Sequence, residues 1–268
     1  PIYSPRNDFF GYKKEIRIVV EGAEFADYFW PAMEQLVECS HDYWRTSGQF
    51  SPNVVIRLAS GGYIGGGIYH SQNIEATLTT FPGLRVVYPT FADDAAGLLR
   101  TAIKSQGPTL YLEPKAQYNS KASMAVVPDD FEVPFGKARI RKSGEQLTIL
   151  TYGNTIHMCL KVAERLEAEE ISVEVIDLLS LNPLDEKAIL DSVEKTNRAL
   201  IVHEDKVFAG FGGELVALIS EKGFNFLDAP VMRVGALYTP VGFNRILERA
   251  TLPDEEKIYE AVTSLLNY

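Results

Sequence analysis

Leu147–Leu178 reads LTILTYGNTIHMCLKVAERLEAEEISVEVIDL, and this stretch decides the fold class. Its two ends, LTILTY and VEVIDL, are β-branched and leucine-rich runs typical of strands that are buried on both faces. Between them, apolar residues recur at helical spacing across Ile156–Glu169. A strand, a helix and a strand in this order predict a right-handed crossover within a parallel sheet, which is the unit of an α/β protein.

The same alternation continues towards the C-terminus. The pattern predicts, in order, helix Asp185–Thr196, strand Ala199–His203, helix Gly213–Lys222, strand Val231–Val234 and helix Asp254–Asn267. With the two strands of the first stretch, this half of the chain is expected to hold four parallel strands joined by helices.

The N-terminal half shows a similar rhythm. Strands are expected at Ile16–Val20, Val54–Leu58, Leu84–Tyr88 and Thr109–Leu112. A helix is predicted across Asp27–Tyr43 with Pro31 in its first turn, where its missing N–H is tolerated. Thr90 and Asp93 resemble a capping box ahead of another helix.

Residues 116–145 interrupt the rhythm with polar, proline-flanked segments, which are typical of a domain boundary. We therefore predict two α/β domains, residues 1–134 and 135–268, each a doubly wound sheet covered by helices.

Composition excludes several function classes. The net charge is −10 and Lys and Arg are scattered, which argues against a nucleic-acid surface and against a polybasic membrane site. No run reaches the length of a membrane span. Cys39 and Cys159 follow no metal-ligand spacing, so no metal site is assigned, and a reduced cytoplasmic protein is expected.

Three segments at strand ends are candidates for chemistry, because ligands of parallel sheets collect there. Ser60–Gln72 (SGGYIGGGIYHSQ) is either an anion-binding nest or a plain turn, and within it His70 with Ser71 is either an acid–base pair or a loop histidine. Glu24–Trp30 (EFADYFW) is either a stacking surface for a planar ring or a core cluster. His203–Gly213 (HEDKVFAGFGG) is either an anion or partner site or a strand-end cap.

These motifs occur together in order with YLEPKAQY, VIDLLSLNPLDEKAILDSVEKT and FNFLDAPVMRVGAL. As a set they resemble the β chain of the thiamine-diphosphate-dependent 2-oxo acid dehydrogenases, from about Ile16 to the end. The resemblance implies a thiamine pyrimidine-binding domain followed by a transketolase-type C-terminal domain. It also implies oxidative decarboxylation of a 2-oxo acid, with a branched-chain acid favoured over pyruvate, and acyl transfer to lipoamide.

By the same resemblance, Tyr28 contacts the pyrimidine ring, Glu24 lines that pocket, and His70 faces the thiazolium and moves protons. An α chain holds the diphosphate through Mg²⁺. A K⁺ ion is implied at backbone carbonyls around Pro52–Val55 and Ala102–Gly107, where Ser105 stands at an often acidic position.

The implied partners are an α chain, a second β chain in an α2β2 assembly, and the lipoyl acyltransferase core, which docks near Leu266–Tyr268. The implied compartment is the cytoplasm, or the mitochondrial matrix in a eukaryote.

The family carries a cofactor-activating glutamate ahead of this region, and no residue upstream of Ile16 resembles its motif. We therefore expect that this chain belongs to a longer β chain or an α–β fusion and is inactive alone. The alternatives are a transketolase-like enzyme and a non-catalytic assembly subunit.

Overall fold

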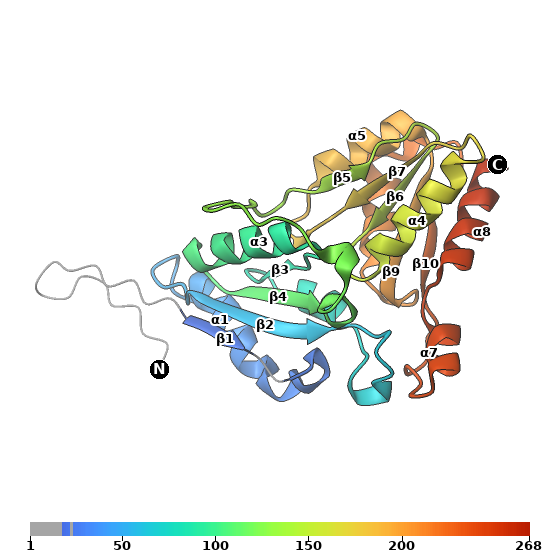
Figure 1. Cartoon of the computed structure of the whole chain (residues 1–268). Coiled ribbons are helices and arrows are strands. Elements are labelled where there is room, and N and C mark those ends of the chain that lie inside the picture. The colour runs from blue at the N-terminus through green and yellow to red at the C-terminus, as the bar shows by residue number, and fades with distance from the viewer. Residues whose placement is uncertain (1–17, 22–23) are drawn as a thin grey trace, which may run out of the picture.

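The computed structural model describes residues 18–21 and 24–268, and these form two five-stranded sheets, each covered by helices (Figure 1). Residues Ile16 and Arg17 of the expected first strand, and everything upstream of them, lie outside the described residues. Within the described part of the chain, no helix is both long enough and apolar enough to cross a bilayer.

The first sheet has the strand order β1-β2-β4-β3-β8. The strands β1, β2, β4 and β3 are parallel, whereas β8 is antiparallel to β3. Its strands and helices are β1 Ile18–Glu21, α1 Met33–Arg45, β2 Val54–Ser60, α2 Glu75–Thr79, β3 Arg85–Val87, α3 Ala92–Lys104, β4 Thr109–Pro114 and β8 Ser180–Asn182.

The second sheet has the order β10-β9-β6-β7-β5, with β5 antiparallel to β7 and the other pairs parallel. Every residue of β6 and β7 is buried, as the continuous apolar runs indicate for strands covered on both faces. The elements are β5 Arg139–Lys142, β6 Leu147–Thr151, α4 Thr155–Glu167, β7 Val173–Asp177, α5 Glu186–Thr196, β9 Ala199–Lys206, α6 Gly212–Lys222, β10 Met232–Ala236, α7 Arg245–Thr251 and α8 Glu255–Leu266.

The helix predicted from Asp27 is wrong at its start. Two 3-10 turns, η1 Ala26–Tyr28 and η2 Trp30–Ala32, precede α1, which begins at Met33. Pro31 lies in the second turn, because it has no N–H for a helix interior and disfavours the α conformation of the residue before it. As a result Tyr28 stands on a short turn rather than on a long helix.

The predicted capping box of α3 is also wrong. The N-cap is Phe91, without a side-chain cap, and the Thr90 hydroxyl instead donates to the Gly153 carbonyl oxygen at 2.9 Å. The Thr90 hydroxyl therefore donates to a carbonyl in the C-terminal half instead of accepting from a local backbone N–H.

Two short strands were not predicted. β5 adds a fifth strand to the second sheet, and β8 leaves the C-terminal half to complete the first sheet beside β3. A three-residue strand such as β8 carries too little pattern to be read from sequence. The division of the chain into residues 1–134 and 135–268 stays a prediction.

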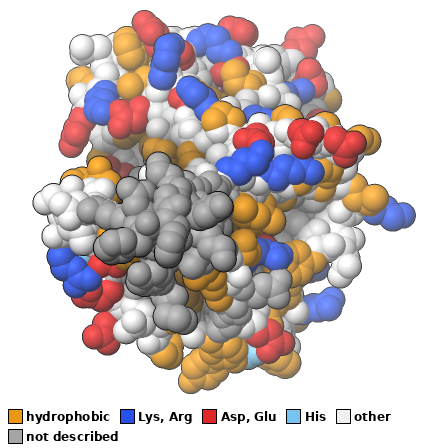
Figure 2. Space-filling view, turned by 90° about the vertical axis from the view of Figure 1, so that its left-hand side faces the viewer, with side chains coloured by type: hydrophobic (Ala, Val, Ile, Leu, Met, Phe, Trp, Pro, Cys, Tyr) orange, Lys and Arg blue, Asp and Glu red, His pale blue; other side chains and the backbone are white. Residues whose placement is uncertain are grey.

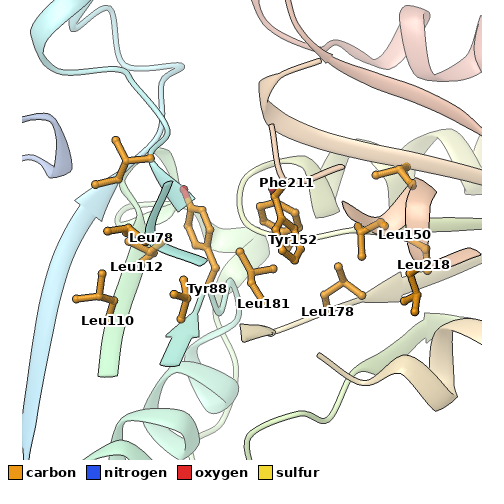
Figure 3. Close-up of a cluster of buried hydrophobic side chains, with 14 of the residues drawn as sticks. Leu78, Tyr88, Leu110, Leu112, Leu150, Tyr152, Leu178, Leu181, Phe211 and Leu218 are labelled. Atoms are coloured by element: carbon orange, nitrogen blue, oxygen red, sulfur yellow. The ribbon is translucent and has the colours of Figure 1, made fainter. Parts of the chain in front are cut away.

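One hydrophobic core spans both sheets (Figure 3). Leu110, Leu112 and Tyr88 come from the first sheet, and Leu150 and Tyr152 from the second, with the two tyrosine rings 5.8 Å apart. The two halves are therefore packed against each other through apolar side chains as well as through the shared strand.

A buried ionic cluster also joins the halves. Arg141 of β5 donates to Asp177 Oδ2 of β7 at 2.8 Å and pairs with Asp94 of α3, and both carboxylates are fully buried. Burial raises the pKa of Asp177 to about 6, although Arg141 opposes that rise. Arg141 therefore compensates Asp177, whereas Asp94 is shared with Arg139, whose Nη2 lies 2.8 Å from Asp94 Oδ1.

We expect Arg141→Met to lower the free energy of unfolding by about 3 kcal/mol at pH 8, because it removes the cation paired with buried Asp177 and leaves Arg139 as the remaining partner of Asp94. The folded pKa of Asp177 lies above its unfolded value, so the folded state binds more protons in that window and the loss shrinks as pH falls towards 5. Urea unfolding at the two pH values measures both effects.

Lys142→Met on the same strand is the matched control, because its pair with Glu167 is exposed. That variant is expected to change the free energy of unfolding by less than about 1 kcal/mol at either pH. Equal losses in the two variants would contradict the role given to Arg141.

Candidate functional site

His70 lies at the end of a glycine-rich loop that follows β2, just after the 3-10 turn Gly67–Tyr69. Its Nε2 is 3.2 Å from the Tyr28 hydroxyl, and its ring centroid is 4.3 Å from that of Phe25. Tyr28 is 42% exposed. The structure thus brings together His70 and Tyr28, two of the three residues predicted for the site, at an open surface. The third, Glu24, is exposed just ahead of η1.

Asp27, between Phe25 and Tyr28, ties the turn to the loop. Its Oδ1 accepts a hydrogen bond from the Gln72 backbone N–H at 3.0 Å, while its Oδ2 is buried with no hydrogen-bond partner among the described residues. Burial raises the pKa of Asp27, and the charges of Lys115 and His70 oppose that rise. An unpartnered oxygen beside an exposed aromatic ring is an available acceptor for a ligand.

Lys115 supplies a buried cation at the carboxyl end of β4. The side chain is 7% exposed, and its Nζ lies 4.7 Å from the centroid of the Phe25 ring. Burial lowers the pKa of Lys115 to about 8, against the opposing charges of Asp27 and Glu204. Lys115 was not predicted as a site residue, although a lysine directly after a buried strand is a visible signal.

The glycine loop is a nest of backbone N–H groups. Residues 61, 63, 65 and 67 have φ of 89°, 63°, 71° and 70°, and Gly66 between them is right-handed. Alternation of left- and right-handed residues points successive N–H groups into one concavity that attracts anions. The nest expected from the sequence is therefore present in the structure.

The anions that fill this nest come from the C-terminal half of the same chain. Glu248 of α7 accepts from the Ile64 and Gly65 N–H groups at 3.1 Å, and Glu204 of β9 accepts from the Gly62 N–H. In Figure 1 the loop and α7 both extend below the two sheets. Three N–H groups of the loop, those of Gly62, Ile64 and Gly65, are thus bound by carboxylates of the same chain and are not free for an external phosphate.

The HEDK segment is interior structure rather than an anion or partner surface. His203, Glu204 and Asp205 are all buried in β9. Burial lowers the pKa of His203 to about 4. A Cβ on Gly212 would lie 2.3 Å from His203 Nε2, so the glycine makes room for the ring.

The described residues offer no group of three or more His, Cys, Asp or Glu side chains suited to a metal ion. Cys39 and Cys159 are buried and unpaired, and burial raises the pKa of the Cys159 thiol to about 12. Both thiols are therefore protonated packing residues.

The segment implied to hold K⁺ already carries a fixed positive charge. Arg85 donates from Nη2 to the Gln106 carbonyl and, at 2.7 Å, to the Gly107 carbonyl. The Ser105 hydroxyl donates to the Thr101 carbonyl at 2.7 Å. A guanidinium therefore already binds two of the carbonyls implied for K⁺, those of Gln106 and Gly107.

The chain is similar to known protein families and to individual known proteins. Residues 11–121 match the family described as transketolase, pyrimidine binding domain, and residues 136–258 match transketolase, C-terminal domain. The 2-oxoisovalerate dehydrogenase subunit beta of Bacillus subtilis is 35% identical, covering 91% of this chain and 75% of that protein. The mitochondrial pyruvate dehydrogenase E1 component subunit beta of Caenorhabditis elegans is 37% identical, covering 88% and 68%.

Among solved structures, a split gene transketolase described as an inactive beta4 tetramer superimposes with a TM-score of 0.72. The match covers 93% of this chain and 75% of that one at 22% identity, which is a likeness of fold. The expected α/β architecture of a pyrimidine-binding and a transketolase-type C-terminal domain is confirmed.

Because Arg85 already binds the carbonyls of the implied potassium segment, we expect K⁺ to leave the stability of the chain unchanged. The melting temperatures in KCl and NaCl of equal ionic strength should agree within about 1 °C, since an ion that binds only the native state raises the melting temperature. Thermal unfolding by circular dichroism makes the comparison. A K⁺-specific increase of several degrees would show that the segment binds the ion.

Proposed function

The chain belongs to the family of β subunits of the 2-oxoisovalerate and pyruvate dehydrogenases, and on that premise we propose that it forms the β part of a 2-oxo acid dehydrogenase decarboxylating component. The observation that carries the proposal is the contact of the Tyr28 hydroxyl with the His70 imidazole at the open end of the glycine loop. A hydroxyl and an imidazole at hydrogen-bond distance on an accessible surface can pass a proton to and from a ligand.

The residues around His70 fit the pyrimidine half of thiamine diphosphate. Tyr28 offers an exposed ring, Asp27 offers an unpartnered buried oxygen, and Glu24 is exposed just ahead of them. We assign the aminopyrimidine to Tyr28 and Glu24. Bound thiamine diphosphate supplies the nucleophilic carbon and the electron sink that decarboxylation of a 2-oxo acid requires.

His70 is then the acid–base group that gives or takes the proton at the reacting acyl group. The half-buried imidazole lies against Phe25 and beside the charges of Asp27 and Lys115. Lys115 places a positive charge in the same region, which favours the approach of a carboxylate such as that of a 2-oxo acid.

The diphosphate and its Mg²⁺ belong, in this proposal, to a separate α chain. Two observations support that division: the nest of the glycine loop is filled by Glu204 and Glu248, and the described residues hold no cluster suited to a metal. The cofactor-activating glutamate implied by the resemblance lies outside the described residues. We therefore propose that turnover requires the α chain and the complete β polypeptide.

An exposed apolar surface beside the site supports the α-chain partner. Ile68 and Tyr69 are 50% and 65% exposed, Phe243 and Ile246 are 78% and 77% exposed, and Phe243 borders the loop at Gly67. Figure 2, which faces the side of β1 and α1, shows further hydrophobic side chains along the lower edge of the molecule. Such a surface is typical of a permanent interface.

The remaining assignments follow the relatives. We propose α2β2 assembly, docking of a lipoyl acyltransferase core near Leu266–Tyr268, and a cytoplasmic or mitochondrial-matrix location. We propose a branched-chain 2-oxo acid as the substrate. Pyruvate is the alternative, since relatives of both kinds have similar identity to this chain.

Reconstitution tests the function. The complete gene product is assembled with its α chain, thiamine diphosphate and Mg²⁺, and decarboxylation of 3-methyl-2-oxobutanoate is compared with that of pyruvate. The complex should turn over a 2-oxo acid, faster for the branched-chain one, whereas the β polypeptide alone should not. An assembled complex that decarboxylates neither acid would leave the chain with an assembly role, and transfer between sugar phosphates would favour the transketolase-like alternative.

We expect His70→Ala to lower the overall rate of the complex by a factor of about 100 or more, because general acid–base catalysis contributes that much. The overall reaction with lipoyl acceptor is the measurement. His41→Ala is the matched control, since His41 lies on the exposed face of α1 and should retain the full rate. An unchanged rate in His70→Ala would remove His70 from the chemistry.

A further inference from the structure

The loop that carries His70 is held by carboxylates from the other half of the chain. Glu204 and Glu248 are each 3% exposed, and both accept from backbone N–H groups of the loop. We propose that Glu248, supported by Glu204, is a positioning residue that sets where the His70 imidazole stands relative to Tyr28. This inference rests on the proposed function, in which His70 transfers the proton.

The grip of Glu248 is on the backbone. Its Oε1 accepts from the N–H groups of Ile64 and Gly65, and its Oε2 accepts from Gly65 again, all at 3.1 Å. Hydrogen bonds to an ionised acceptor are the stronger kind, and a carboxylate spanning two adjacent N–H groups fixes their orientation as well as their place. Helix α7 therefore acts on the conformation of the loop rather than on any one side chain.

Glu204 binds the loop nearer its N-terminal end, at Gly62. It accepts from the Gly62 N–H and, at 2.6 Å, from Asn154 Nδ2. A Cβ on Gly61 would lie 2.9 Å from Glu204 Oε1, and the φ of Gly61 is 89°. Glycine is needed there for both reasons, because a side chain would strain the backbone and push the carboxylate away.

The segment between Gly65, where Glu248 binds, and His70 is short and closely packed. Gly67 borders Phe243, with 3.3 Å from a built Cβ to the Phe243 Cβ, and a Cβ on Gly66 would lie 2.7 Å from the His70 Cβ. Four residues separate Gly65 from His70, and they run through a tight 3-10 turn. A displacement at Gly65 is thus transmitted to the imidazole.

The far side of His70 is fixed by other contacts. The Gln72 N–H donates to Asp27, and Lys206 Nζ donates to Gln72 Oε1 at 2.9 Å. His70 therefore lies between the contacts of Glu248 at Gly65 and the contacts at Gln72, and its position depends on the path of the loop between them. Glu248 controls that path, and a misplacement of about 1 Å in a catalytic group can reduce the rate about 100-fold.

The test is Glu248→Gln in the complete complex. The amide keeps the size and one acceptor oxygen but loses the charge and the second acceptor. We expect kcat to fall about 10-fold or more with KM for the 2-oxo acid nearly unchanged, because His70 is misplaced while the binding surfaces remain. In a His70→Ala background, Glu248→Gln should cause no further loss, since it acts through the imidazole.

A second readout does not depend on turnover. Hydrogen exchange of the Ile64 and Gly65 amides, followed without cofactor, should be about 10-fold or more faster in Glu248→Gln, because their acceptor is weakened. Glu221→Gln on the exposed face of α6 is the matched control, and it should alter neither rate nor exchange. If Glu248→Gln does not fold, Glu248→Asp keeps the charge with a shorter reach and is expected to show the same changes.

The outcomes separate the inference from the function on which it rests. An equal fold-loss in wild-type and His70→Ala backgrounds, or unchanged kcat with unchanged exchange, would overturn the positioning role. A wild-type complex that decarboxylates no 2-oxo acid would overturn the proposed function instead. In that case amide exchange still decides whether Glu248 holds the loop.

Discussion

Two sets of polar groups, each costly to bury without a partner, meet where the N-terminal and C-terminal halves of the chain pack together. The backbone N–H groups of the Gly61–Gly67 loop need acceptors, and the carboxylates of Glu204 and Glu248 need donors. An unpaired buried donor costs about 1–3 kcal/mol, and an unpaired buried charge costs more. Because each group supplies what the other lacks, the loop takes its shape only when the C-terminal half is docked. The contact between His70 and Tyr28 and the exposed apolar surface next to it both depend on that docking.

The same pairing limits what the nest can bind. A glycine-rich nest after a strand is the usual place for a phosphate in α/β proteins, but here protein carboxylates occupy it. The N–H groups that these carboxylates bind are not free for a diphosphate. Near them this chain provides an aromatic ring, an imidazole and the buried side chains of Asp27 and Lys115. In the function proposed above, these residues recognise a ring and move protons.

Much of the fold could be predicted because buried strands of parallel sheets are continuous apolar runs, as in β6 and β7. The nest and His70 could also be predicted, since glycine spacing and a titratable ring are local signals. The anion in the nest could not, because Glu248 is 183 residues from Gly65 and looks like any glutamate on a short helix. The capping box predicted at Thr90 is wrong for the same reason, because its hydroxyl donates to a carbonyl in the other half instead of bonding to a local N–H. Long-range polar contacts produce no periodic pattern in the sequence from which they could be predicted.

The small strand β8 has a consequence for how this polypeptide can be divided. It leaves the second half to lie antiparallel to β3, with Asn182 Nδ2 donating to the Leu84 carbonyl at 2.7 Å. A gene cut in the polar stretch between the sheets would strip β3 of its neighbour and leave an open edge, which pairs readily with other chains. The two halves therefore differ in sequence but cannot be produced independently. Any recombined, truncated or separately expressed first half has to include Ser180–Asn182, because otherwise its unpaired strand edge favours aggregation.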